Sequence, residues 1–340
     1  MPSPRVLAVP LVVALAAAGL TACSEDGDDA IAVGDVAATE AVSEPLDGLT
    51  AWVTVPTGTL EVEVAEPATE VGEQQAVDGA RLLRLTTAFQ DAEVRADVWA
   101  FAAREGSAEP VTLALDVEGD RYDLGVVRHG ASGGDDLVPD DALLAVPDDV
   151  ELDDVAVVVG YDGLDQTVSP ADGSREPSPA DPLYDEEQRG RSVDCSDGLF
   201  RPRLSPQVRC RAGEARLLPY LPGLGWAERG RAWLVVSVGA EMAPFRVGAA
   251  GYAAGRVRNR TQLDDQDPVA RFDEKAEDGS YSAQLAFDVP RRNDSTVAGA
   301  LQIRLDYRLR LAAGDAPPGG GPDDIEFFKA VVVPAAAPTT

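Results

Sequence analysis

Apolar and polar side chains alternate residue by residue along most of the chain after residue 48. Leu60, Val62 and Val64, for example, are separated by Glu61 and Glu63. Because successive side chains of a β-strand point to opposite faces, this period of two predicts strands that bury one face. The same pattern predicts further strands at 81–89, 94–98, 111–117, 121–127 and 155–161 in the first half, and at 233–238, 281–289, 300–311 and 325–333 in the second.

The stretch 300–311 alternates most strictly, and this alternation does not fit an α-helix. Its apolar face runs from Leu301 to Leu311, and its polar face includes Arg304, Arg308 and Arg310. Clusters of Gly, Pro and Asp separate the predicted strands, and no long amphipathic helix is expected between them. The sequence therefore predicts an all-β fold built from β-sandwiches.

The start of the chain follows a different pattern. Arg5 precedes an apolar stretch from Val6 to Leu20, and an acidic run follows Cys23. This is the layout of a secretory signal peptide, because the apolar stretch is shorter than the roughly 20 residues of a transmembrane helix. Leu20-Thr21-Ala22-Cys23 resembles the lipobox of bacterial prolipoproteins. The resemblance implies that residues 1–22 are removed and that Cys23 receives a diacylglyceryl group, which anchors the protein to the membrane.

Composition divides the rest of the chain into four parts. Residues 23–48 are acidic and nearly free of large apolar groups, which predicts a disordered tether. Residues 169–194 contain repeated X-Pro steps among polar residues and predict a linker. The linker would join a β-sandwich domain at 49–168 to a second one at 195–335.

The net charge of −30 is concentrated in the first half. Residues 1–190 contain 9 Arg and 40 Asp or Glu, whereas residues 191–340 contain 20 basic and 19 acidic side chains. An acidic first half repels nucleic acid and anionic lipid, so we expect no nucleic-acid partner. The basic residues are nearly all Arg, with Lys275 and Lys329 the exceptions. This bias resembles the composition of proteins from high-GC Gram-positive bacteria.

A weak internal repeat relates the two halves. Residues 79–83 resemble 230–234, Val146-Pro147 resembles Val289-Pro290, and the strand of Tyr161 resembles the strand of Tyr307. Through its Val-Pro and Tyr positions the chain resembles secreted actinobacterial lipoproteins that carry immunoglobulin-like domains. The resemblance covers short parts of each half. It implies two immunoglobulin-like β-sandwich domains that form an extracellular binding or structural module without catalytic residues.

Few residues offer catalytic or metal-binding chemistry. His129 is the single histidine, and although Ser132 follows it, no nucleophile motif surrounds the pair, so we expect a surface residue. Four Asp doublets within 135–154 would suit calcium, but they lack EF-hand or RTX spacing, and a solvated acidic face is the simpler interpretation. We therefore expect no cofactor and no enzyme activity. A secreted hydrolase or a calcium-dependent binding module is the alternative.

The second half offers two specific interactions. Cys195 and Cys210 form an even pair outside the membrane, which indicates a disulfide. Seven Arg lie between residues 189 and 216, and three more, Arg304, Arg308 and Arg310, share one strand face. Because side chains two apart on a strand are roughly 6.6 Å from each other, these three are candidates for binding an anionic cell-envelope polymer or an acidic protein. A solvated strand face with local ion pairs is the alternative. The sequence thus predicts a lipid-anchored binding protein on the outer face of the cytoplasmic membrane.

Overall fold

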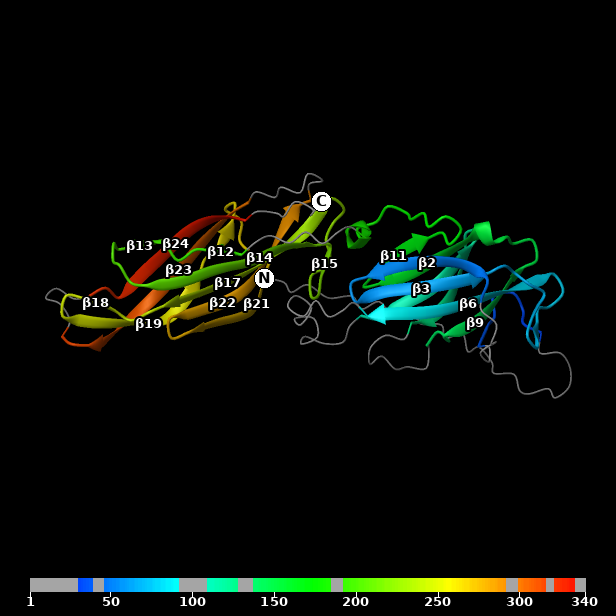
Figure 1. Cartoon of the computed structure of the whole chain (residues 1–340), viewed down its shortest axis with the longest axis horizontal. Coiled ribbons are helices and arrows are strands. Elements are labelled where there is room, and N and C mark those ends of the chain that lie inside the picture. The colour runs from blue at the N-terminus through cyan, green and yellow to red at the C-terminus, as the bar shows by residue number, and fades with distance from the viewer. Residues whose placement is uncertain are drawn as a thin grey trace, which may run out of the picture.

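The structure, a computed structural model, describes residues 30–38, 46–91, 109–127, 137–184, 192–291, 299–315 and 321–333. In these ranges every regular element is a strand apart from two short 3₁₀ turns, which confirms the predicted all-β fold class. The strands form two sandwiches placed end to end along the longest axis (Figure 1). None of the helical turns in the described ranges is long and apolar enough to cross a membrane.

The first sandwich encloses its core between two antiparallel sheets. The five-stranded sheet has the order β1 (Val36–Ala38), β9 (Asp141–Pro147), β6 (Ala80–Asp91), β3 (Gly58–Ala65), β2 (Gly48–Val55). The four-stranded sheet has the order β11 (Leu164–Val168), β10 (Val155–Tyr161), β7 (Val111–Val117), β8 (Asp120–Val126). A small hairpin, β4 (Glu70–Val71) and β5 (Gln74–Gln75), and the 3₁₀ turn η1 (Leu152–Asp154) lie outside these sheets. Leu60, Leu85 and Leu113 meet in the core, as their alternation predicts.

The second sandwich has the same two-layer plan. One sheet has the order β12 (Val193–Asp194), β14 (Val208–Leu218), β17 (Arg231–Met242), β22 (Ser280–Pro290), β21 (Ala270–Glu277). The facing sheet has the order β13 (Leu199–Arg201), β24 (Asp324–Val333), β23 (Gly299–Ala313), β19 (Ala250–Asn259), β18 (Phe245–Val247), with β20 (Gln262–Leu263) also paired to β23. Tyr281, Phe287, Tyr307 and Phe327 are at most 2% exposed and fill the core between the sheets.

Part of the predicted disordered tether is a strand, which corrects the expectation for residues 30–38. β1 pairs with β9, and Ile31 exchanges main-chain hydrogen bonds with Gln75 and Val77 at 2.8 and 3.1 Å. The physical reason lies on the outer face of the first sandwich, where Leu82 and Leu143 are both 0% exposed because Ile31 and its neighbours cover them. Residues 46–48 of the predicted tether are also described, and Gly48 begins β2, whereas residues 23–29 and 39–45, including Cys23, lie outside the described residues.

The segment predicted as a linker, residues 169–194, has two described parts. Residues 192–194 include β12, which pairs with β14, so this end belongs to the second sandwich and corrects the predicted boundary. Residues 169–184 pack against the first sandwich and end in the 3₁₀ turn η2 (Asp181–Tyr184). The hydroxyl of Tyr184 accepts a hydrogen bond from the main-chain N–H of Thr54 at 3.1 Å and donates one to Oε1 of Gln166 at 3.0 Å. The guanidinium of Arg175 lies 3.5 Å from the centre of the Tyr184 ring. These contacts close the sandwich between β2 and β11.

A two-stranded hairpin, β15 (Tyr220–Leu221) and β16 (Gly225–Trp226), joins the two sandwiches. Figure 1 shows it between the two groups of sheets. Tyr220 is 3% exposed and belongs to the core of the first sandwich, where its ring lies 5.3 Å from that of Tyr161. Leu221 packs instead against the second sandwich. Because the hairpin enters the core of the first sandwich and packs on the outer face of the second, we name it, together with Tyr161, the joint.

The structure shows a local equivalence behind the weak sequence repeat. In the first sandwich Gly79 accepts a main-chain hydrogen bond from Asp148, which follows the Val-Pro step of β9. In the second, Gly230 accepts the corresponding bond from Arg291, which follows the Val-Pro step of β22. The strand order β3-β6-β9 of the first sandwich matches β14-β17-β22 of the second.

Candidate functional site

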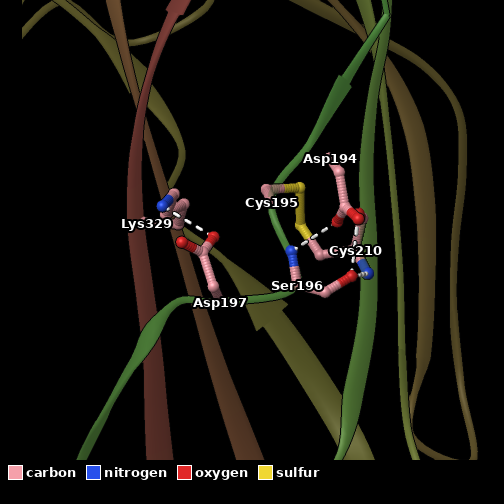
Figure 2. Close-up of a disulfide and its surroundings, with 6 residues drawn as sticks. All are labelled: Asp194, Cys195, Ser196, Asp197, Cys210 and Lys329. Carbon is pink, nitrogen blue, oxygen red and sulfur yellow. Dashed lines mark hydrogen bonds and ion pairs between the residues drawn. A yellow bond between two sulfur atoms is a disulfide. The ribbon is translucent and has the colours of Figure 1, made fainter.

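The predicted disulfide between Cys195 and Cys210 is present, with the two Cα atoms 4.8 Å apart (Figure 2). It ties the segment after β12 to β14, where both cysteines are buried. The hydroxyl of Ser196 accepts a hydrogen bond from the N–H of Cys210 at 2.9 Å, and the N–H of Cys195 donates to the carbonyl of Cys210 at 3.1 Å. The covalent link therefore sits within a local main-chain network.

The segment that carries Cys195 crosses between the two sheets of the second sandwich. It leaves β12 in the sheet of β14 and β17 and enters β13 in the sheet of β24 and β23. Asp194 accepts a hydrogen bond from the N–H of Ser196 at 2.8 Å, which lowers the pKa of its carboxyl. Asp197 lies 2.7 Å from Nζ of Lys329 on β24, and this contact lowers the pKa of Asp197 (Figure 2). The disulfide thus fixes one end of the crossing, and the exposed ion pair lies at the other.

Two shallow grooves with volumes of about 620 and 350 Å³ lie on the outer face of the sheet that contains β14 and β17. Arg211 and Gly239 line both. The other lining residues are mainly small or exposed and polar. Such a surface does not by itself identify a ligand.

The outer face of the opposite sheet carries the arginines that alternation predicted on β23. Arg308 and Arg310 are exposed there. The alternating residues of the same strand point into the core, namely Leu305, Tyr307 and Leu309. Arg304 is only partly exposed. Its Nη2 donates a hydrogen bond to Gln302 at 2.9 Å, and its guanidinium lies 5.3 Å from the centre of the Phe328 ring.

The three predicted arginines are therefore not equivalent. The guanidinium of Arg304 is already in contact with Gln302 and Phe328. Its Nε is buried and has no hydrogen-bond partner within the described ranges. Arg310 lies 3.8 Å from the exposed carboxylate of Asp278, a contact that contributes little because both groups are in water. Arg308 forms no ion pair within the part of the chain that the structure describes.

The neighbouring strand β19 adds two arginines that sequence reasoning missed. Arg256 and Arg258 are exposed on the same outer face as Arg308. A β-bulge between Ala254 and Val257 places both Gly255 and Arg256 opposite Arg308. The sequence signal at this strand is weak because its buried face is partly alanine.

A cluster of opposite charges limits this positive surface on one side. Arg260 lies 2.7 Å from Asp306 and 3.6 Å from Glu326, and the contact with Asp306 raises the pKa of Arg260. These carboxylates are therefore already engaged by Arg260. Of the seven arginines between 189 and 216, Arg189 and Arg191 lie outside the described residues, and the others are dispersed: Arg216 is buried in β14 while Arg201, Arg203, Arg209 and Arg211 are exposed on different segments.

His129 and the doublet Asp135-Asp136 lie outside the described residues. The doublet Asp140-Asp141 contributes Asp141 to a bidentate ion pair with Arg84, at 2.6 and 3.1 Å, on β9 and β6. Within the described ranges no three His, Cys, Asp or Glu side chains converge as ligands for a metal ion.

No protein-family model, curated protein or solved structure matches this chain.

Proposed function

We propose that this protein is an exported lipoprotein, anchored through a lipid on Cys23 to the outer face of the cytoplasmic membrane, and that it acts as a non-catalytic binding module. Its two sandwiches serve as one elongated spacer that holds a binding surface away from the bilayer. The observation that carries this proposal is the joint, in which Tyr220 enters the core of the first sandwich while Leu221 packs on the outer face of the second.

The joint supports a spacer because domains connected only by a linker are expected to move independently. Here the ring of Trp226 lies 6.3 Å from Tyr161 and 5.1 Å from Tyr220, and its indole N–H donates to the main-chain oxygen of Tyr161 at 2.9 Å. Aromatic pairs of this kind contribute about 0.5–1.5 kcal/mol each beyond their buried area. They therefore favour one relative orientation of the two sandwiches.

Export is supported by the disulfide as well as by the signal-peptide pattern of residues 1–22. Disulfides persist in oxidising compartments, and the Cys195–Cys210 pair lies in the half farther from Cys23. The β-sandwiches and the Gly79 and Gly230 equivalence support the resemblance to immunoglobulin-like lipoprotein modules. In Figure 1 the dark blue segment, residues 30–38, lies on the half of the first sandwich away from the second.

The experiment that tests this proposal is fatty-acid labelling and fractionation of cells that express the chain or its Cys23→Ser variant. We expect labelled, membrane-bound protein that added protease removes from intact cells, and an unlabelled Cys23→Ser protein that is unprocessed or released. Cys195→Ala is the matched control, because it removes a cysteine without touching the lipobox. A Cys23→Ser protein that fractionates and migrates like the wild type would contradict the proposal.

A further inference from the structure

Four exposed arginines form a diagonal row across β19 and β23. Arg258 lies opposite Asp306, Arg256 lies opposite Arg308 at the bulge, and Arg310 lies one step farther along β23, opposite Ala253. Steps of two residues on a strand are about 6.6 Å, and adjacent strands are about 4.8 Å apart. The row, which we name the arginine face, therefore spans about 13 Å along the strands.

The charge on the arginine face is only partly balanced. Arg256, Arg258 and Arg308 form no ion pair within the described ranges, and Arg310 has only its 3.8 Å contact with Asp278. Asp306, the nearest acid along the row, is held by Arg260 at 2.7 Å. Guanidinium groups left in water in this way are free to bind an anionic group in bidentate geometry.

The surroundings of the row indicate what kind of anion it fits. The outward positions between the arginines are Gly255 and Ala253, so the row contains no large apolar side chain. A folded protein partner needs an apolar or aromatic centre to its interface, and the four-arginine row itself supplies no such side chain. The two grooves described above lie on the other sheet of this sandwich, so neither adjoins the row. A linear, flexible chain of separate charges needs neither an apolar interface centre nor an enclosed pocket, because it binds by repeated single contacts.

We propose that the arginine face binds a linear phosphodiester polymer, with one phosphate at each level of the row. This inference rests on the proposed function, because an anchored spacer would hold the face toward the surrounding envelope. Phosphate is the better match than carboxylate because a phosphodiester stays charged under acidic conditions that would protonate a carboxylate, while it offers each guanidinium two oxygens as a carboxylate does.

The test uses the whole chain and synthetic poly(glycerol phosphate) as the probe, with binding measured across a salt series. Contacts to three phosphates, one at each level of the row, predict that the logarithm of the affinity falls with the logarithm of the salt concentration by about 0.7 for each phosphate. The variant Arg256→Gln with Arg308→Gln removes both guanidinium groups of one level, so it should weaken binding about tenfold at low salt and reduce the slope by about 0.7. The matched control is Arg209→Gln with Arg229→Gln, which removes the same charge from exposed positions away from β19 and β23.

We expect the control to bind like the wild type and both double variants to keep the wild-type melting temperature. The proposal is overturned if the polymer does not bind at low salt, or if the control loses as much affinity as the variant of the face. It is also overturned if poly-L-glutamate of equal charge binds as tightly, since that result would indicate an acidic protein. The polymer-binding test uses purified protein and the labelling test uses cells. A failure to bind the polymer therefore leaves the labelling of Cys23 unaffected, and a failure of labelling leaves the binding result unaffected.

Discussion

The indole N–H of Trp226 donates a hydrogen bond to the main-chain oxygen of Tyr161 across 65 residues of sequence, at a distance of 2.9 Å. The bond joins a hairpin of the second sandwich to the last residue of β10 in the first. A second indole, that of Trp233, donates to the carbonyl of Gly225 at 2.9 Å and holds the turn end of the same hairpin. The hairpin is therefore fixed at both of its ends.

Replacing Trp226 with Ala should uncouple the two sandwiches. The change removes two aromatic contacts and one hydrogen bond, and we expect a loss of about 2–3 kcal/mol. Scanning calorimetry should then show two separated unfolding transitions in place of one, and small-angle scattering should show a broader range of overall lengths. Trp226→Phe is the control, because it keeps a ring in the joint and should retain most of the coupling. A single unshifted transition in Trp226→Ala would mean that the hairpin does not couple the domains.

The joint should also weaken at alkaline pH. Burial raises the pKa of Tyr161 to about 12, and burial also raises the pKa of Tyr220 beside it. A tyrosine in the unfolded chain has a pKa of about 10, so the folded protein holds the proton more tightly. The stabilisation is therefore complete below pH 10 and is lost as the pH rises from about 10 through 12.

Urea unfolding at pH 8 and pH 11 tests this directly. The free energy of unfolding should fall between these values in the wild type, and it should fall less in Tyr161→Phe, which has no hydroxyl to ionise. Tyr122→Phe is a useful comparison, since Tyr122 is less buried and lies on β8, opposite Leu115. If the free energy of unfolding falls equally between pH 8 and pH 11 in the wild type and in Tyr161→Phe, ionisation of Tyr161 does not cause the alkaline destabilisation.

The alternation of side chains was enough to predict the strands whose two faces differ most. The strand predicted at 155–161 coincides with β10, because valines pack inward there and an Asp-Gly turn with positive φ follows at once. The strand predicted at 233–238 is longer at both ends in β17. Gly239 and Ala240 are too small to continue the apolar signal, although the pairing with β22 continues past them.

Features that depend on a distant partner could not be predicted in this way. The sequence of residues 30–38 resembles an acidic tether. Their strand is explained only by the apolar side chains on the outer faces of β6 and β9, which this segment buries. Tyr220 and Trp226 lie in a Pro- and Gly-rich stretch, and only the end of β10 explains their burial. In the candidate site, the disulfide was predicted because Cys195 and Cys210 are an even pair of cysteines expected to lie outside the membrane. The engagement of Arg304 by Gln302 and Phe328, and the bulge that adds Arg256, depend on the register of neighbouring strands.

Removal of the disulfide should destabilise the second sandwich by a similar amount whichever cysteine is replaced. Cys195 and Cys210 enclose a loop of 15 residues, for which the chain-entropy model gives about 3 kcal/mol. Cys195→Ala and Cys210→Ala should therefore lower the melting temperature equally, and the double variant should add little. Lys329→Met is a matched control, because it removes only the exposed contact with Asp197 at the other end of the crossing. Intact mass after alkylation of unreduced, denatured protein checks the link itself, and two labelled thiols would disprove it.

The equivalence of Gly79 and Gly230 gives a prediction that does not involve side-chain packing. Their φ angles are 81° and 80°, a left-handed conformation that costs other residues about 1–2 kcal/mol. A Cβ added at either position would meet nothing within 4 Å, so the strain of the backbone is the whole effect. Gly79→Ala and Gly230→Ala should each lower the free energy of urea unfolding by about 1 kcal/mol. Gly239→Ala is the matched control, since its Cβ also meets nothing and its φ is not positive, so it should be neutral or slightly stabilising. If all three substitutions have the same effect, the two glycines do not share a conformational role in the repeat.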